Sequence, residues 1–171
     1  MKYTWPIAGG MSALLSEVAV RPARRPDENA RLRLWVTYIR EMRKQTKRYA
    51  EPDRAARSFW RAEMREAFAG RTSKVFVAVH RGRIIGTVYV NDFRHEPHIR
   101  PRRIGYIFGV YVAPRFRRQG VMERLLAEAD SWCTRRGIRS RSAWVLADNP
   151  AALRIFAGLG FRPSAHYLIR D

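Results

Sequence analysis

The sequence predicts a mixed α/β domain in which a single mixed, twisted sheet carries helices on both faces. Segments with the two-residue period of strands alternate with segments of helical period, and no internal repeat or long linker separates them. Apolar residues make up 46% of the 171 residues, which is enough for one core and too much for a disordered chain. Because strand–helix–strand connections cross over a sheet face, helices are expected on both sides.

The first half of the chain is predicted to form a strand, two helices and a hairpin. Asp27 is expected to cap the first helix, and Phe59 and Trp60 are expected on the apolar face of the second. Arg81-Gly82 suits a tight two-residue hairpin turn. The predicted elements, in chain order, are a strand over 17–21, a helix capped by Asp27 and periodic to Met42, a helix opened by Pro52–Asp53 and stopped by Gly70, and strands over 74–80 and 83–90.

The second half alternates strands with helices after a polar, basic loop. Gly109 lies inside an apolar strand, where a glycine often marks a bulge or the close approach of another group. Cys133, the single cysteine, falls on the inward side of its helix and is expected to be a packed thiol. The predicted elements are a loop over 91–103, a strand over 104–112, a helix over 121–136, a strand over 142–146, a helix over 150–159 and a strand over 161–169.

The segment from Val112 to Leu126 carries the clearest chemical signal. A strand ends at Ala113-Pro114, a short basic loop follows, and a helix begins just after Gly120. The first amides of a helix have no intrahelical acceptor and lie at the positive end of the helix dipole, so they suit a pyrophosphate. Taken alone, the pattern also fits an ordinary strand–helix connection with solvated arginines.

Two motifs in this order resemble the GNAT acyltransferase superfamily. The run Arg117-Arg118-Gln119-Gly120-Val121-Met122 is similar to its Arg/Gln-x-x-Gly-x-Gly/Ala loop. The segment from Asn149 to Phe161 is similar to its closing Asn-x-x-Ala-x-x-x-Tyr-x-x-x-Gly-Phe pattern, and the hairpin over 76–90 is like its second and third strands. The resemblance implies the GNAT fold, with a splayed fourth and fifth strand pair. It also implies an N-terminal extension over 1–16 and a single N-acetyltransferase domain over 17–171.

The resemblance implies an acetyl-coenzyme A site. Main-chain groups of the fourth strand would pair with the pantetheine arm, and amides of the basic loop would bind the pyrophosphate. The coenzyme-binding residues that it implies are Val110, Tyr111, Val112, Arg117, Arg118, Gln119, Gly120, Val121, Met122, Asn149 and Phe156. This chain departs from the family at three positions. Met122 stands for a glycine or alanine, Phe156 for the tyrosine that acts as general acid, and Tyr106 for a glutamate base.

With both proton-handling positions changed, Tyr106 and Tyr111 are the candidates for ordering water near the amine, although a strand tyrosine more often serves packing. His95 and His98 in the basic loop have a pKa range that suits a general base. No metal site is expected, because neither a cysteine nor a pair of carboxylates accompanies these histidines.

The predicted activity is transfer of an acetyl group from acetyl-coenzyme A to a primary amine by direct attack in a ternary complex. Two alternatives stay open: an acyl-coenzyme A-binding module with impaired catalysis, and an acetyltransferase acting on an anionic acceptor such as aminoacyl-tRNA. The net charge of +19 and the basic loop over 94–103, expected to border the acceptor, disfavour polycationic acceptors. A small-molecule or peptide amine is therefore expected, and a nucleic acid is not favoured.

The sequence also bears on location and assembly. No run approaches the roughly 18–20 apolar residues that a membrane span needs. Residues 1–16 lack the cleavage pattern of a signal peptide. We therefore expect a cytoplasmic protein without membrane contact, as a monomer or homodimer.

Overall fold

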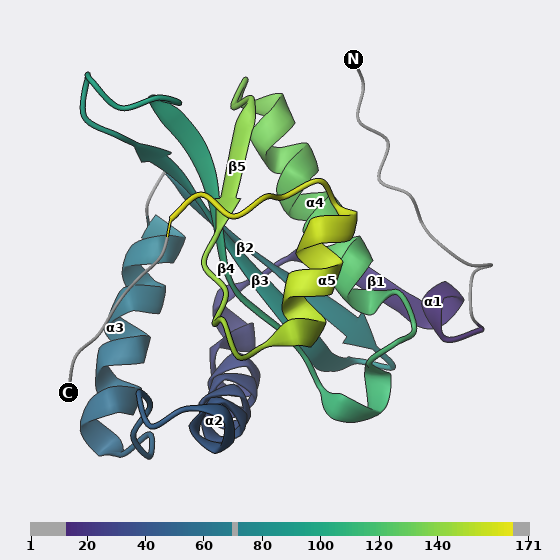
Figure 1. The fold of residues 1–171 in the computed structure, drawn as a ribbon. Coiled ribbons are helices and arrows are strands. Elements are labelled where there is room, and N and C mark those ends of the chain that lie inside the picture. Colours follow the sequence, from purple (N-terminus) through teal and green to yellow (C-terminus); the bar gives the residue numbers. More distant parts are fainter. Residues whose placement is uncertain (1–12, 70–71, 166–171) are drawn as a thin grey trace.

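The computed structural model describes residues 13–69 and 72–165, which form one five-stranded sheet between two helical layers (Figure 1). The strands lie side by side in chain order, antiparallel except for the parallel last pair. They are β1 (Val18–Pro22), β2 (Ser73–His80), β3 (Arg83–Arg94), β4 (Arg103–Val112) and β5 (Ser140–Ala143). The predicted mixed sheet is thereby confirmed.

The helices divide between the two faces of this sheet. Helices α2 (Glu28–Gln45) and α3 (Arg54–Ala69) cover one face, while α4 (Val121–Arg135) and α5 (Pro150–Gly158) lie on the other (Figure 1). The short α1 (Ala13–Glu17) precedes β1, and its Leu15 packs into the core on the α4 side. Single 3-10 turns, η1 (Arg25–Asp27) and η2 (Pro114–Phe116), precede α2 and follow β4. Among the residues described, no helix is both long and apolar enough to cross a membrane.

Local turn chemistry was predicted well. Arg81 and Gly82 adopt φ values of 47° and 72°, and His80 pairs with Arg83 across them, so the expected two-residue turn is confirmed. Trp60 is buried as predicted, but Phe59 is 68% exposed, so its placement on the apolar face was wrong. The two residues are neighbours on a helix and therefore point in directions about 100° apart.

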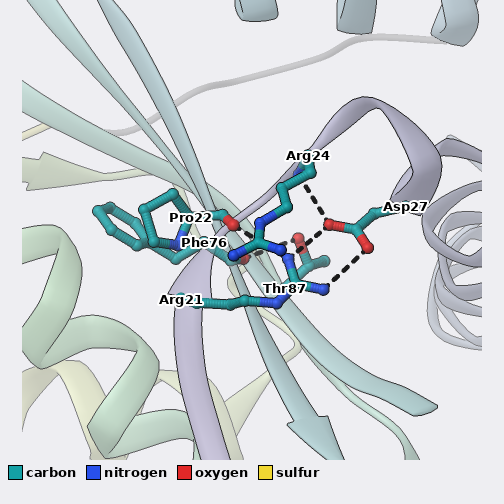
Figure 2. A network of polar contacts seen from close by, with 6 residues as sticks. All are labelled: Arg21, Pro22, Arg24, Asp27, Phe76 and Thr87. Carbon is teal, nitrogen blue, oxygen red and sulfur yellow. Dashed lines mark hydrogen bonds and ion pairs between the residues drawn. The ribbon is translucent and has the colours of Figure 1, made fainter. Parts of the chain in front are cut away.

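Asp27 occupies the N-cap position of α2, as predicted, but its side chain makes no capping hydrogen bond because the carboxylate accepts from other donors. Figure 2 shows Arg21 donating to both Asp27 oxygens at 2.7 and 2.9 Å, and the Arg24 amide donating at 2.7 Å. The Arg21 guanidinium lowers the pKa of Asp27. Asp27 thus connects β1 to the turn before α2. Figure 2 also shows the Thr87 hydroxyl of β3, which donates to the Phe76 carbonyl of the adjacent β2 at 3.3 Å.

Three predicted boundaries need correction. The loop over 91–103 is shorter, since β3 continues to Arg94 and β4 begins at Arg103; the Arg103–Asp92 ion pair holds these polar ends together. Strand β5 lies two residues earlier than predicted, where its register with β4 places it. Residues 161–165 of the predicted last strand are not a strand, and residues 166–169 lie outside the described part.

Candidate functional site

A bulge in β4 creates the first feature of the site. Thr87 of β3 pairs with Tyr111, and Tyr89 pairs with Phe108. Two residues of β4, Gly109 and Val110, therefore lie opposite the single β3 residue Val88. Gly109 has a φ of +56°, and a Cβ there would lie 2.7 Å from the Tyr89 ring. The bulge that Gly109 predicted is confirmed, and only glycine fits it without strain.

The pairing of β4 with β5 ends close to this bulge. Its last pair is Ile107 with Ala143, whereas β4 continues along β3 to Val112. The two strands therefore separate over the last part of β4, as the predicted splay requires. Main-chain groups of this part are directed toward the side that β5 has left.

The loop after β4 presents the start of α4 to the same region. Gly120 occupies the N-cap with a φ of +80°, and no side chain caps the helix. The first helical bond runs from the Arg124 amide to the Gly120 carbonyl, so the amides before Arg124 lack an intrahelical acceptor. A Cβ at Gly120 would lie 2.8 Å from the Leu15 side chain, which explains why glycine stands here. These amides can bind an anion.

Arg117, at the start of this loop, is held by a helix that the sequence did not connect to it. Its Nη2 donates to Glu41 of α2 at 2.6 Å, and its Nε donates to the Val112 carbonyl at 2.8 Å. The Tyr111 hydroxyl donates to the other Glu41 oxygen at 2.8 Å. Glu41 was missed because it lies 70 residues or more from both partners, and its position on α2 gave no signal beyond an acid in a basic helix.

The two tyrosines singled out for catalysis both keep their protons at neutral pH. Tyr111 is buried, and burial followed by its bond to Glu41 raises its pKa. Tyr106 is half-buried and stacked on Phe108, and burial raises its pKa as well. Protonated phenols donate hydrogen bonds but cannot take a proton from an amine.

Comparison with known proteins gives this geometry a family. The model of the acetyltransferase (GNAT) family matches residues 36–161. The chain belongs to the GNAT acetyltransferase family. Its α/β fold with the splayed strand pair is the one that the sequence resemblance implied.

The relatives and solved structures that this chain resembles include aminoglycoside acetyltransferases. Aminoglycoside N(6′)-acetyltransferase type 1 of Salmonella typhimurium is 28% identical over 93 residues, covering 50% of this chain and 60% of that protein's length. The enzyme of the same name from Serratia marcescens is 32% identical over 111 residues, covering 59% of this chain and 70% of that protein. The structure of aminoglycoside N-acetyltransferase AAC(6′)-Iy in complex with CoA superposes with a TM-score of 0.69. It is 17% identical, over 90% of this chain and 93% of that one.

The remaining residues implied by the GNAT resemblance fall into three groups. Val110 and Met122 pack against the apolar core on the α4 side. The Met122 side chain therefore points into the core and away from the free amides at the start of α4, and its own amide remains among them. Asn149 caps α5, accepting from the Ala152 amide at 3.1 Å, and Phe156 of α5 is buried. The other positions lie at the end of β4, in the loop and at the first residue of α4; they are Val112, Arg118, Gln119 and Val121.

The basic loop, which the sequence was expected to place beside the acceptor, lies away from the bulge. It ends at Arg103, at the opposite end of β4 from Gly109, and six residues of strand span on the order of 20 Å. His95 and His98 therefore lie away from the region where β4 and β5 separate. Within residues 13–69 and 72–165, no cluster of metal-binding side chains occurs.

Cys133 is a packed thiol, as predicted. Its side chain is fully buried, and burial raises its pKa to about 11. A Cβ at Gly105 would lie 2.3 Å from its sulfur, so β4 and α4 are in close contact there. The thiol therefore serves packing between the sheet and α4.

Proposed function

We propose that the protein is an N-acetyltransferase that uses acetyl-coenzyme A as co-substrate and a primary amine as acceptor. The observation that carries this proposal is the bulge of β4 at Gly109, where the β4–β5 pairing ends, beside the uncapped amides of α4. Membership of the GNAT family supports it independently.

Each part of the coenzyme meets matching chemistry in this proposal. The amides from Arg118 to Met122 bind the pyrophosphate, because the start of α4 favours anions. Main-chain groups of 110–112 pair with the pantetheine amides, because β5 has left this part of β4. Asn149 and Phe156 flank the pantetheine from α5. Arg117 braces the loop through Glu41 rather than binding the phosphates with its side chain.

The proposed reaction is direct attack. The amine nitrogen forms a bond to the acetyl carbon and loses a proton, the carbon–sulfur bond breaks, and the leaving thiolate takes up a proton, so the products are the amide and the free thiol. An alkylamine with a pKa near ~10 must first lose a proton at neutral pH. Tyr106 and Tyr111 hold their own protons, so neither accepts it. The Tyr106 hydroxyl orders the water that does, while Tyr111, which donates a hydrogen bond to Glu41, braces β4. A main-chain amide at the bulge stabilises the charge on the acetyl oxygen.

Calorimetric titration with acetyl-coenzyme A and a thiol-release assay over a panel of primary amines test the proposal. We expect coenzyme binding and amine-dependent thiol release in the parent protein. Gly109→Ala should weaken coenzyme binding, because the added Cβ meets Tyr89. Gly82→Ala is the matched control, since Gly82 also has a positive φ but faces open space in the β2–β3 turn.

The outcomes separate the alternatives. No coenzyme binding at millimolar concentration overturns the proposal. Coenzyme binding without turnover of any amine favours the binding module with impaired catalysis. Thiol release with aminoacyl-tRNA alone favours the nucleic-acid acceptor. In that case the affinity for tRNA should fall steeply as the salt concentration rises.

A further inference from the structure

Aromatic rings form a continuous row on the α2–α3 face of the sheet. The ring centroids of Tyr89 and Phe108 are 5.3 Å apart, and those of Phe108 and Tyr106 are also 5.3 Å apart, with the latter pair stacked at 16°. Tyr89 is buried, whereas Phe108 and Tyr106 are half-buried. The row therefore runs from the core outward along β3 and β4.

Helix α2 and its connection to α3 add further rings to this row. The ring of Tyr38 on α2 lies edge-on to Tyr111, with centroids 5.7 Å apart, and Tyr49 lies close enough to Tyr38 and Tyr106 to influence their ionisation. The neighbouring Arg48 lies with its guanidinium 5.4 Å from the ring centroid of Trp144, which is 40% exposed. Together these side chains make an acceptor-side aromatic cluster, defined as Tyr38, Tyr49, Tyr106, Phe108 and Trp144.

This cluster lies where an attacking amine has to be. Phe108 directly precedes the bulge at Gly109, and Trp144 directly follows the last β5 residue that pairs with β4. The cluster is thus within one or two residues of the point where the strands separate. An amine that reaches the thioester from this side has aromatic rings beside the group that carries it.

Two carboxylates on this side, Glu41 and Glu51, are already neutralised. Glu41 is held by Tyr111 and Arg117. Glu51, beside the same α2–α3 connection, is paired with Arg40 and Arg43. A polycationic acceptor needs unpaired negative charge to offset the repulsion of a chain with a net charge of +19. An acceptor with one positive charge is repelled less and does not need such unpaired negative charge.

We propose that the acceptor is a monoamine carried on a flat aromatic group, bound by stacking on the acceptor-side aromatic cluster. Aromatic side chains offer large apolar area and preferred ring geometries to such a group. This inference rests on the proposed acetyltransferase function. It sets the chain apart from the relatives whose names specify aminoglycosides.

Steady-state kinetics with three amines test the inference: 2-phenylethylamine, n-hexylamine of similar apolar length, and the polycation kanamycin. We expect kcat/KM for 2-phenylethylamine to exceed that for each of the others about tenfold, consistent with one additional stacking contact. Trp144→Ala should lower kcat/KM for 2-phenylethylamine about tenfold, mainly through KM, and leave n-hexylamine within about twofold. Trp144→Phe, which keeps a ring, should recover most of the loss.

Phe59→Ala provides the control, because Phe59 is an exposed aromatic residue of α3 outside the cluster and its loss should leave all three amines unchanged. Preference for kanamycin, or an equal loss for both monoamines in Trp144→Ala, overturns the inference and leaves the acetyltransferase function standing. Failure to release thiol with 2-phenylethylamine in a coenzyme-binding protein overturns it too. Loss of coenzyme binding in the parent overturns the proposed function itself.

Discussion

The two faces of the sheet have cores of different amino-acid composition. On the α4–α5 face the core is mostly aliphatic, and Leu125, Leu126 and Cys133 are fully buried. On the α2–α3 face the core is smaller and aromatic, and it encloses Arg31, which is also fully buried. The guanidinium of Arg31 lies 5.1–5.5 Å from the rings of Trp60, Phe68 and Tyr89.

This difference separates stability from function. The aliphatic face holds the sheet to α4 and keeps the start of that helix in place for an anion. The aromatic face accepts polar groups, tyrosines and a buried cation whose Nε and Nη1 lack hydrogen-bond partners. Such a face contributes less stabilisation, because a buried polar group without a partner costs free energy. It also presents rings and hydroxyls beside the bulge, and the predictions below test this division.

Truncating the aliphatic face should have the largest effect. Leu125→Ala removes a fully buried side chain and should lower the free energy of unfolding by about 2–5 kcal/mol. Leu153→Ala in α5 is the control, because Leu153 is 41% exposed and should cost far less. Urea unfolding followed by circular dichroism measures the free energy of unfolding of both variants. Similar losses in the two would contradict the expectation that the buried core of this face supplies most of the stability.

The ion cluster at the end of the aliphatic face should come next. Asp92 is 5% exposed and accepts from Arg103 at 2.6 and 2.7 Å and from Arg136 at 3.2 Å. These guanidinium groups, Arg103 foremost, lower its pKa. Asp92→Asn should therefore lower the free energy of unfolding by about 1–3 kcal/mol at neutral pH.

The pH dependence of this loss has a definite sign. A carboxylate whose pKa is lowered on folding stabilises the protein above its unfolded pKa of about 4, and this contribution disappears as the pH falls through the folded pKa. The gap between parent and Asp92→Asn should therefore narrow as urea unfolding is repeated toward about pH 3. The exposed Asp148→Asn is the control. A gap that does not change with pH would exclude the ionic origin.

Replacing the buried cation of the aromatic face should stabilise the protein. Arg31→Met keeps an unbranched side chain but removes a charge that pairs with no carboxylate among the described side chains, so we expect a gain of about 1 kcal/mol. Tyr89 accepts from Arg31 at 2.7 Å and loses this hydrogen bond in the variant. Thermal unfolding of Arg31→Met and Arg31→Ala separates loss of charge from loss of volume. A lower melting temperature for both would show that the cation itself is needed.

Loosening the link between Glu41 and β4 should have the smallest effect. Tyr111→Phe removes one hydrogen bond to Glu41 while Arg117 keeps its own, so we expect a cost of about 0.5–1 kcal/mol in unfolding. If the proposed function holds, kcat should change by less than about threefold, because Tyr111 braces rather than transfers protons. A loss of roughly a hundredfold or more in kcat with unchanged coenzyme binding would instead identify Tyr111 as a proton-handling group.

Local patterns sufficed for much of the fold and for the phosphate loop. The hairpin at Arg81-Gly82, the bulge at Gly109 and the start of α4 after Gly120 depend on backbone preferences of a few neighbouring residues, so the sequence reveals them. The inward positions of α4 follow from helical period for the same reason. Strand limits were harder, because β5 is defined by its register with β4 and the ends of β3 and β4 by an ion pair across the hairpin.

By itself, the sequence determined the order of elements, the family and the loop that suits a pyrophosphate. Only the tertiary structure decided which distant groups meet: Glu41 with Arg117 and Tyr111, Arg31 with its three rings, and Trp144 with Arg48. It also placed the basic loop at the opposite end of β4 from the bulge at Gly109. Contacts across 70 residues follow from how helices pack on a sheet, and no local periodicity encodes that packing.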